Sequence, residues 1–514
     1  MVFSSHLFFF YFLPLSLAVY YLLPRRGKHL ALTILSYVFY GWANPLFVVL
    51  MFVSTLIDYV CGLFISEQVK RWGEVEEGRS RKEKRKTNIR ALFCLLPFSF
   101  CLLRPVRLLE RGGSRSREQK IALVTSICSN LALLGFFKYF NFATENYDAV
   151  VKMLGLSGLS LDLAFKITLP LGISFYTFQS MSYSIDVYRG DAKAIRNFID
   201  FACYVSMFPQ LVAGPIIRFQ EVADQLEHRT CTVQKFARGA AFISVGLAKK
   251  VLLANSMGKI ADVTFDAGAV GTFDAWLGAI AYAFQIYYDF SAYSDMAIGL
   301  GLILGFTFAK NFDSPYKSES ITEFWRRWHI SLSTWLRDYL YVPLGGNRKG
   351  KARTYANLAI TMLLGGLWHG ASWNFVIWGG LHGGMLAFER ALGKQSIYHR
   401  LPRPVRIGIT FIIVLFGWVF FRAADLPAAL TYCRAMLGLA HAGEAASLLG
   451  GIIHQPYYVG SFVAAAAIAW GFPQTWDWTR RISVPKAAVV VAMLWVSLIV
   501  LTTQSFNPFI YFIF

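Results

Sequence analysis

Charged side chains are scarce in this sequence. Only 16% of its 514 residues are Asp, Glu, Lys or Arg, whereas a soluble chain is nearer about a quarter charged. Apolar residues take their place: 56% are hydrophobic, the mean hydropathy is +0.46, and apolar runs of about 20 residues recur from end to end. The shortage of charge excludes an ordinary soluble protein and predicts an all-α, polytopic membrane protein.

Acidic residues are the scarcer of the two charge types. The sequence has 30 Asp and Glu against 50 Lys and Arg, which gives a formal net charge of +20. Because the basic residues cluster in short loops between apolar runs, they follow the positive-inside rule and do not indicate nucleic-acid binding. Residues 25–28, 66–120 and 189–196 are therefore predicted to face the cytoplasm, with the N-terminus outside. Membrane lipids and an anionic soluble donor suit this charge.

Several familiar motifs are missing. The seven cysteines include no CxxC pair, so neither a disulfide framework nor a metal site is expected. No repeat of fixed period is present. The first apolar stretch, residues 5–24, lacks a small-residue cleavage pattern and is interpreted as a retained span instead of a signal peptide. The GxSxG nucleophile motif is absent too, so a covalent enzyme intermediate is not indicated.

The apolar runs predict about 11 to 13 spans or half-spans in one integral-membrane domain, residues 1–514. Residues 91–103 are too short to cross and are expected to be re-entrant or interfacial. Prolines and glycines predict broken helices at residues 167–188 and 198–217. The other predicted spans lie near residues 30–42, 45–65, 121–142, 240–253, 273–288, 292–308, 357–367, 371–391, 406–421, 457–470 and 487–503.

A histidine lies inside the apolar stretch at residues 363–384, LLGGLWHGASWNFVIWGGLHGG. As one helix these residues would rise about 33 Å, near the thickness of a bilayer's hydrocarbon core, and would hold His369 at depth. Placing an ionisable side chain at that depth costs a few kcal/mol of free energy, so a functional role is the first hypothesis for it. A packed helix whose histidine bonds a neighbouring carbonyl explains this segment alone equally well. Gly366 and Gly370 stand one turn apart, so neighbouring backbones could approach closely.

A second histidine lies in the amphipathic segment 320–340, SITEFWRRWHISLSTWLRDYL. Ser320 and Glu323 form a capping-box pattern, which marks a helix start. At about 100° per residue, the large apolar side chains, Trp328 among them, fall within an arc of about 160°, and four charged residues take the opposite side. This predicts one helix in the membrane interface with His329 directed inward. A purely structural histidine would fit the same pattern.

Two carboxylates stand in or beside apolar sequence at residues 287–299, YYDFSAYSDMAIG. Polar groups inside a membrane need partners. Arg326 and Arg327 are candidates for that role, and we favour structural pairing over direct catalysis. The polar residues of this segment are Asp289, Ser291, Ser294 and Asp295.

Five segments together resemble bacterial membrane-bound O-acyltransferases of the alginate O-acetyltransferase type. They read RRWHISLSTWLRDYLYVPLGGNR, LWHGASWNFVIWGGLHG, YYDFSAYSDMAIG, LGISFYTFQSMSYSIDVYRG and FPQLVAGPIIR. The closing FNPFIYFIF is similar to the tail of that branch. The family core lies at residues 166–384 and contains both histidine motifs, whereas residues 66–120 and 441–454 carry no such resemblance.

This resemblance implies a bundle of spanning and re-entrant helices around a central funnel. It assigns the invariant membrane histidine to His369 and a second, cytoplasmic-side histidine to His329. It also implies acetyl transfer from a cytoplasmic donor, acetyl-CoA or another acyl thioester, to hydroxyls of an exported polysaccharide such as alginate. The setting is the bacterial inner membrane, with a periplasmic or extracellular acetyltransferase as partner and no bound cofactor.

General-base chemistry fits this assignment. An alcohol attacks a thioester poorly until a base accepts its proton, and neutral imidazole suits that task at cellular pH. His369 is therefore predicted to be the base. Asn374 could orient it or bond the acyl carbonyl. His382 would lie about 220° around the same helix and is given a packing role.

Other activities fit parts of this pattern. A D-alanyl transferase of teichoic-acid modification shares the two-histidine layout and would take its acyl group from a carrier protein. A transporter or flippase would also have broken helices and polar groups at mid-membrane. Within the acyltransferase hypothesis, direct transfer and a relay through a partner protein's serine both remain open.

Overall fold

The computed structural model describes residues 2–42, 44–66, 108–268, 270–393, 397–440, 446–504, 506–508 and 510. Within these ranges the chain forms helices and no β-strand, which confirms the predicted all-α class. It divides into two compact units, one of residues 10–212 and 216–230 and one of residues 2–9, 213–215 and 231–514. The expected re-entrant segment 91–103 and most of the basic loop 66–120 lie outside the described residues.

The first unit contains the broken helices that proline and glycine predicted. Gly172 has φ +75° and directly precedes α6, and a Cβ on it would meet the Leu211 carbonyl oxygen at 2.4 Å. The segment 198–217 likewise breaks after Ser206. The helices of this unit are α1 (Leu13–Leu22), α2 (Lys28–Gly41), α3 (Leu46–Ile65), α5 (Arg117–Met153), α6 (Ile173–Arg189), α7 (Phe198–Ser206), α8 (Phe208–Leu211) and α9 (Phe219–Glu227).

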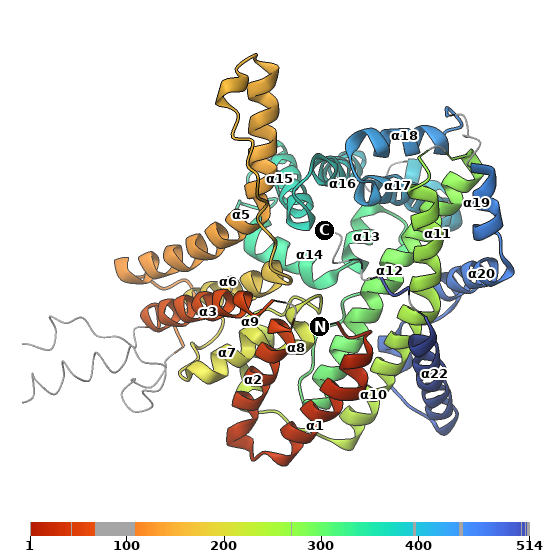
Figure 1. Cartoon of the computed structure of the whole chain (residues 1–514). Coiled ribbons are helices and arrows are strands. Elements are labelled where there is room, and N and C mark those ends of the chain that lie inside the picture. The colour runs from red at the N-terminus through yellow and green to blue at the C-terminus, as the bar shows by residue number, and fades with distance from the viewer. Residues whose placement is uncertain are drawn as a thin grey trace, which may run out of the picture. The chain divides into compact units, whose positions relative to one another are not determined.

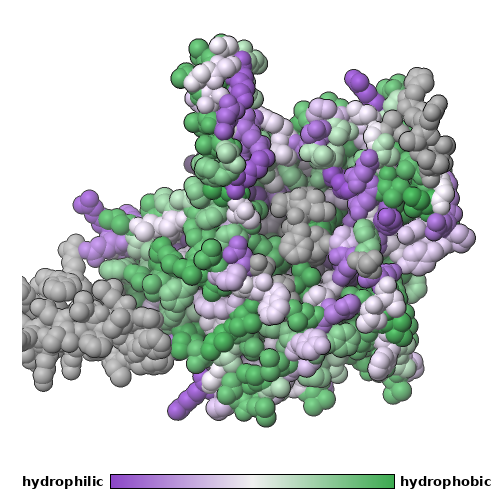
Figure 2. All heavy atoms as spheres, in the orientation of Figure 1, coloured by the Kyte–Doolittle hydropathy of each residue, from purple (hydrophilic) through white to green (hydrophobic). Residues whose placement is uncertain are grey.

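The outer faces of several helices are apolar. Leu30, Ile34 and Val38 of α2 stand one turn apart and are about half exposed. Figure 2 shows hydrophobic residues gathered over α1 and α2, as lipid contact requires. Four described helices are long and apolar enough to cross a membrane: α3, α5, α17 (Arg403–Arg422) and α22 (Val484–Thr503). The chain is thus a membrane protein, while the expected 11 to 13 spans and half-spans stay a prediction.

The second unit holds every predicted site residue. Its longest helix, α12, packs beside α10 and α11 (Figure 1). The separate spans predicted at 273–288 and 292–308 are wrong, because α12 is continuous from Thr272 to Ile303. The remaining helices are α10 (Val233–Ala248), α11 (Asn255–Phe265), α13 (Ile321–Arg327), α14 (Ile330–Leu336), α15 (Lys351–His369), α16 (Trp373–Leu392), α18 (Leu426–Met436), α19 (Ala446–Ile453), α20 (Pro456–Gly471) and α21 (Thr475–Trp478).

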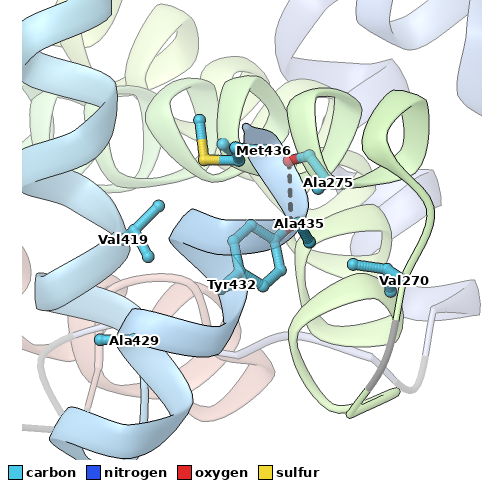
Figure 3. Packing of buried hydrophobic residues seen from close by; sticks show 8 residues of the cluster. Val270, Ala275, Val419, Ala429, Tyr432, Ala435 and Met436 are labelled. Atoms are coloured by element: carbon cyan, nitrogen blue, oxygen red, sulfur yellow. Dashed lines mark hydrogen bonds between the residues drawn. The ribbon is translucent and has the colours of Figure 1, made fainter. Parts of the chain in front are cut away.

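A compact apolar cluster joins α12, α17 and α18. Figure 3 shows Tyr432 of α18 reaching α12, where its hydroxyl donates to the Ala275 carbonyl oxygen at 3.1 Å. Val419 of α17 is fully buried in the same cluster. Small residues, Ala429 and Ala435, let the helix backbones come close (Figure 3). This packing fixes α17 against α12, and both helices supply walls of the candidate site.

Candidate active site

His329 lies at a break between α13 and α14. The expectation of one continuous helix over 320–340 is wrong, because the Asn311 carbonyl oxygen takes the Ile330 N–H at 2.9 Å and its side-chain oxygen takes the Ser331 N–H at 3.2 Å. Asn311 lies well before these residues in the sequence. Its two hydrogen bonds change the direction of the chain at His329, so that α13 ends and α14 begins. His329 itself has φ +42°, in the left-handed region.

The predicted helix start at Ser320 is confirmed, since Ser320 directly precedes α13. The Ser320 hydroxyl accepts the Glu323 N–H at 3.0 Å, as a capping box requires. The return bond differs, because the Glu323 carboxylate accepts from the Glu319 N–H instead. Glu389 of α16 also accepts the N–H groups of Ile321 and Thr322, at 2.6 and 2.9 Å. A carboxylate at a helix N-terminus is favourable, so this contact anchors α13 to α16.

The His329 side chain is fully buried, as predicted. Its Nδ1 lies 3.3 Å from both Asn311 Oδ1 and Ser331 Oγ. Since Ser331 donates its own proton to Asn311, Nδ1 is the protonated nitrogen and Nε2 carries a lone pair. Nε2 has no hydrogen-bond partner in the part of the chain that the structure describes. Burial lowers the pKa of His329 to about 3, so this acceptor stays neutral at cellular pH.

His369 is the last residue of α15 and lies at a helix end. The interpretation of 363–384 as one helix is therefore wrong, whereas the spans predicted separately at 357–367 and 371–391 correspond to α15 and α16. The helix stops because Gly370 is extended, and the Phe375 ring leaves no room for a Cβ at that position. α16 begins at Trp373, so the segment forms two helices joined at a half-buried histidine.

The predicted close approach of glycine backbones is confirmed. A Cβ on Gly366 would meet the Phe375 carbonyl oxygen at 2.2 Å, and one on Gly379 would meet the Met362 carbonyl oxygen at 2.4 Å. The backbones of α15 and α16 thus touch, with no side chain between them. This contact fixes the position of His369 at the end of α15.

An apolar pocket opens beside His369. Aromatic rings surround the imidazole, with the ring centroid of Phe421 at 5.1 Å and that of Trp378 at 5.2 Å. His369 is the one titratable side chain among the lining residues of this pocket. The lining residues are Ile286, Phe290, Trp328, His369, Trp418, Phe421 and Ile510.

Both histidines contact one aromatic wall. The Phe290 ring lies 4.6 Å from the His329 ring and also lines the pocket of His369. The Trp368 ring lies 6.0 Å from His329 and 5.0 Å from His369. Trp328, predicted as a supporting residue, lines the pocket directly and is 2% exposed. His329 stands behind this wall and is not among the residues that line the pocket.

The two carboxylates of α12 pair with lysines. Asp289 lies 2.8 Å from Lys250, and Asp295 lies 2.8 Å from Lys249. The arginines Arg326 and Arg327 were therefore the wrong partners. The lysines come from the π-helical turn Lys249–Ala254, where the irregular backbone turns adjacent side chains toward α12. Two adjacent lysines inside the apolar run 240–253 were a signal that sequence reasoning missed.

The other predicted residues are buried but serve different contacts. Asn374 donates to the Ala423 carbonyl oxygen at 2.9 Å, so its amide nitrogen holds the end of α17. His382 accepts from the Trp325 indole at 3.3 Å, and its ring stacks on Phe324, which is a packing environment. The Ser291 and Ser294 hydroxyls are buried and lack hydrogen-bond partners within the described ranges.

No group of three or more His, Cys, Asp or Glu side chains with metal-binding proximity occurs among the described residues. The site therefore offers an imidazole in an apolar, aromatic pocket, a second neutral imidazole behind its wall, and buried hydroxyls nearby. Such a site suits proton transfer in a place from which water is excluded.

Comparison with known proteins identifies the family of this chain. The model of the membrane-bound O-acyltransferase family matches residues 192–425. The chain is 41% identical to "Probable alginate O-acetylase AlgI" of Azotobacter vinelandii over all of both chains. The protein of the same name from Pseudomonas aeruginosa is 46% identical over 85% of this chain and 75% of its own length. "Peptidoglycan O-acetyltransferase" of Helicobacter pylori is 33% identical over 85% and 80%.

The chain belongs to the membrane-bound O-acyltransferase family. Its relatives along the full chain are of the alginate O-acetylase type, as the sequence motifs predicted. The predicted enzyme class, an O-acyltransferase, is confirmed with the family.

Proposed function

We propose that this protein transfers an acetyl group from a cytoplasmic acyl thioester to a hydroxyl group of an exported polysaccharide, with alginate as the first acceptor to test. The observation that supports the proposal most is the position of His369, which is half-buried and is the one titratable side chain lining an apolar pocket. The names of these relatives support an acetyl group and a polysaccharide acceptor.

His369 acts as the general base in this proposal. It accepts the proton of the acceptor hydroxyl while the oxygen attacks the thioester carbonyl carbon. The carbon–sulfur bond then breaks, and the imidazolium returns the proton to the departing thiolate. The apolar lining keeps water away from the thioester, which protects it from hydrolysis. The same proton transfer serves a direct transfer or a relay whose first acceptor is a partner protein's serine.

His329 assists on the donor side. Its Nδ1 is held by Asn311 and Ser331, so its Nε2 lone pair has a fixed direction and can accept one hydrogen bond from the donor. Ser291 and Ser294 provide buried hydroxyls on the same stretch of α12 as Asp289 and Asp295. The two carboxylates are structural in this proposal, because each is already paired with a lysine.

The protein works in the bacterial cell membrane with its N-terminus outside. The apolar helices and the basic loops support this orientation. A periplasmic acetyltransferase completes the modification of the polysaccharide. Peptidoglycan is a second acceptor to test, since one relative that matches most of the chain is named for it.

Mass spectrometry of exported polysaccharide tests the proposal. Cells that lack the protein are complemented with wild type, His369→Gln or His454→Gln, and O-acetyl esters are counted. Wild type and His454→Gln should restore acetylation, since His454 is about half exposed, near Asp274, and does not line the pocket. His369→Gln keeps a hydrogen-bonding group but no base, so transfer should fall by about 10²- to 10⁴-fold.

Two results would contradict the proposal. Acetylation by a folded His369→Gln variant at more than about a tenth of the wild-type rate would exclude His369 as the base. An equal ester content with and without the protein would exclude the acetyl-transfer function itself and favour transport.

A further inference from the structure

A buried ion pair holds a segment made of residues 506–508 and 510 beside the pocket. Asp289 Oδ1 lies 2.8 Å from Lys250 Nζ, while Asp289 Oδ2 accepts the Ile510 N–H at 2.9 Å. Lys250 also donates to the Pro508 carbonyl oxygen. Both charged side chains are almost fully buried, at 3% and 2% exposure. The two charges therefore use part of their hydrogen-bonding capacity to hold this segment.

Further bonds fix the same segment. Asn255 of α11 donates to the Phe506 carbonyl oxygen at 3.3 Å, and Asn507 donates to the Ser4 carbonyl oxygen at 2.5 Å. A buried ion pair is tolerated better when further hydrogen bonds compensate its charges, and here the Pro508 carbonyl oxygen and the Ile510 N–H supply one such bond to each partner. Breaking these bonds would leave the two buried charges with fewer hydrogen-bond partners, which is unfavourable in an apolar interior.

Ile510 is thereby placed in the wall of the pocket that contains His369. Its side chain is 2% exposed and faces the same space as Ile286, Phe290 and Trp418. The aromatic members of this wall pack against other rings: Phe290 on Phe312 at 5.0 Å, and Trp418 on Trp328 at 4.9 Å. These rings cannot move without displacing the rings packed against them. The position of the Ile510 side chain, in contrast, depends on the hydrogen bonds of its own backbone.

We propose that Ile510 determines the length of the acyl group that this enzyme accepts, and that the Lys250–Asp289 pair positions it. The proposal rests on the proposed function. An acetyl group has only a methyl to place in the apolar pocket beside His369. A butyryl group has two more carbons, which would overlap the Ile510 side chain. Ile510→Ala removes three carbons from the wall and makes room for the longer chain.

The ratio of two acyl transfers tests this proposal. Membranes containing the full-length protein are supplied with acetyl-CoA or butyryl-CoA and a polysaccharide acceptor, and the esters are measured by mass spectrometry. Ile510→Ala should raise the butyryl-to-acetyl ratio by about 10-fold or more, as one or two methylene groups do in other apolar pockets. Ile298→Ala is the matched control, because Ile298 of α12 is also 2% exposed but does not line the pocket.

A double variant tests the positioning role of the ion pair. Lys250→Met with Asp289→Leu removes both charges together, so neither is left unpaired in the interior. Its melting temperature should stay near that of wild type, while the butyryl-to-acetyl ratio should rise as it does in Ile510→Ala, since Ile510 loses its anchor. A structural role alone would lower the amount of active protein and leave the ratio unchanged.

The outcomes separate this proposal from the function on which it rests. Acetyl transfer at the wild-type ratio by Ile510→Ala would overturn the specificity role and leave the proposed function intact. An equal shift of the ratio in Ile298→Ala would also overturn it, because any loosening of the unit would then suffice. If wild type transferred neither acyl group, the proposed function would fail, and this inference with it.

Discussion

His329 combines a left-handed backbone with a fully buried imidazole. Among the described residues only Asp162, Ser314 and His329 have positive φ without being glycine. Such a conformation costs about 1 to 3 kcal/mol and persists only where the surroundings impose it. Here Asn311 imposes it, through both its backbone and its side chain. The strain fixes the direction of Nε2, which is what a donor-binding group needs.

Replacing this imidazole should weaken donor binding as well as catalysis. His329→Asn is the informative change, because Asn tolerates the left-handed conformation and keeps a polar atom near the position of Nδ1 while it removes the outer part of the ring with Nε2. Transfer should fall, and the KM for acetyl-CoA should rise. His369→Ala, in contrast, should lower kcat with little change in KM. Steady-state kinetics in membranes distinguishes the two. An unchanged KM in a folded His329→Asn variant would contradict the donor-side role.

The protonation of His329 also predicts a pH dependence of stability. Burial lowers its pKa from the ordinary 6.5 to about 3. As the pH falls below about 6.5, the unfolded chain therefore binds a proton that the folded chain does not, and the free energy of unfolding decreases. His329→Asn removes this group, so its melting temperature should decline less than that of wild type between about pH 7 and pH 5. If the melting temperatures of wild type and His329→Asn declined equally over this pH range, His329 would make no such contribution.

Sequence reasoning singled out both histidines, because an ionisable residue in an apolar run is conspicuous, and their roles in transfer stay predictions. It missed Lys250 as the partner of Asp289, since only the π-helical turn brings that lysine to α12. The Asn374 amide nitrogen bonds the Ala423 carbonyl oxygen while its Oδ1 has no hydrogen-bond partner among the described residues, so the role suggested for Asn374 near the base stays a prediction. Partners that lie far apart in the chain depend on tertiary packing, which a local pattern does not contain.

Helix ends were harder to predict than helices. Residues 406–421, 457–470 and 487–503 were predicted as spans and form α17, α20 and α22. The break at His329 was missed, and a false break was placed within α12, whereas the separate spans predicted at 357–367 and 371–391 do allow for the break after His369. Each true break depends on a group from elsewhere in the chain or on a glycine whose contact is tertiary. Amphipathic periodicity continues through such a break and therefore does not reveal it.

The contact between α15 and α16 gives a sharp comparison of two glycines on one helix. A Cβ on Gly379 would meet a backbone oxygen at 2.4 Å, while one on Gly384 would meet nothing within 4 Å. Gly379→Ala should destabilise the protein by about 1 to 3 kcal/mol and lower transfer by shifting His369. Gly384→Ala should be neutral or stabilise the helix by up to about 1 kcal/mol. Melting temperature and acetyl transfer are the measurements, and equal behaviour of the two variants would contradict the close contact.

The orientation of the whole chain in the membrane is the remaining prediction. Single cysteines are placed in a cysteine-free background at Lys193, Arg353 or Ser157, all exposed positions. Residues 189–196 and 347–353 are predicted to be cytoplasmic from their basic residues, so the first two should resist an impermeant thiol reagent in intact cells. Residues 145–165 lie between the predicted spans 121–142 and 167–188 and, with the loops on either side cytoplasmic, are expected outside, so a cysteine at Ser157 should react. Ready labelling at Lys193 or Arg353 would reverse the orientation of that loop.

The anchoring of Ile510 has a consequence for biosynthesis. Chains are made from the N-terminus onward, and domains form in that order. Ile510 follows every other lining residue of the pocket in the chain, after α22 has been made. All helices of this unit can therefore enter the membrane while the pocket still lacks one wall. A chain truncated after α22 would keep both histidines but lack Ile510, so its pocket should be incomplete and its preference for the acetyl group should be lost.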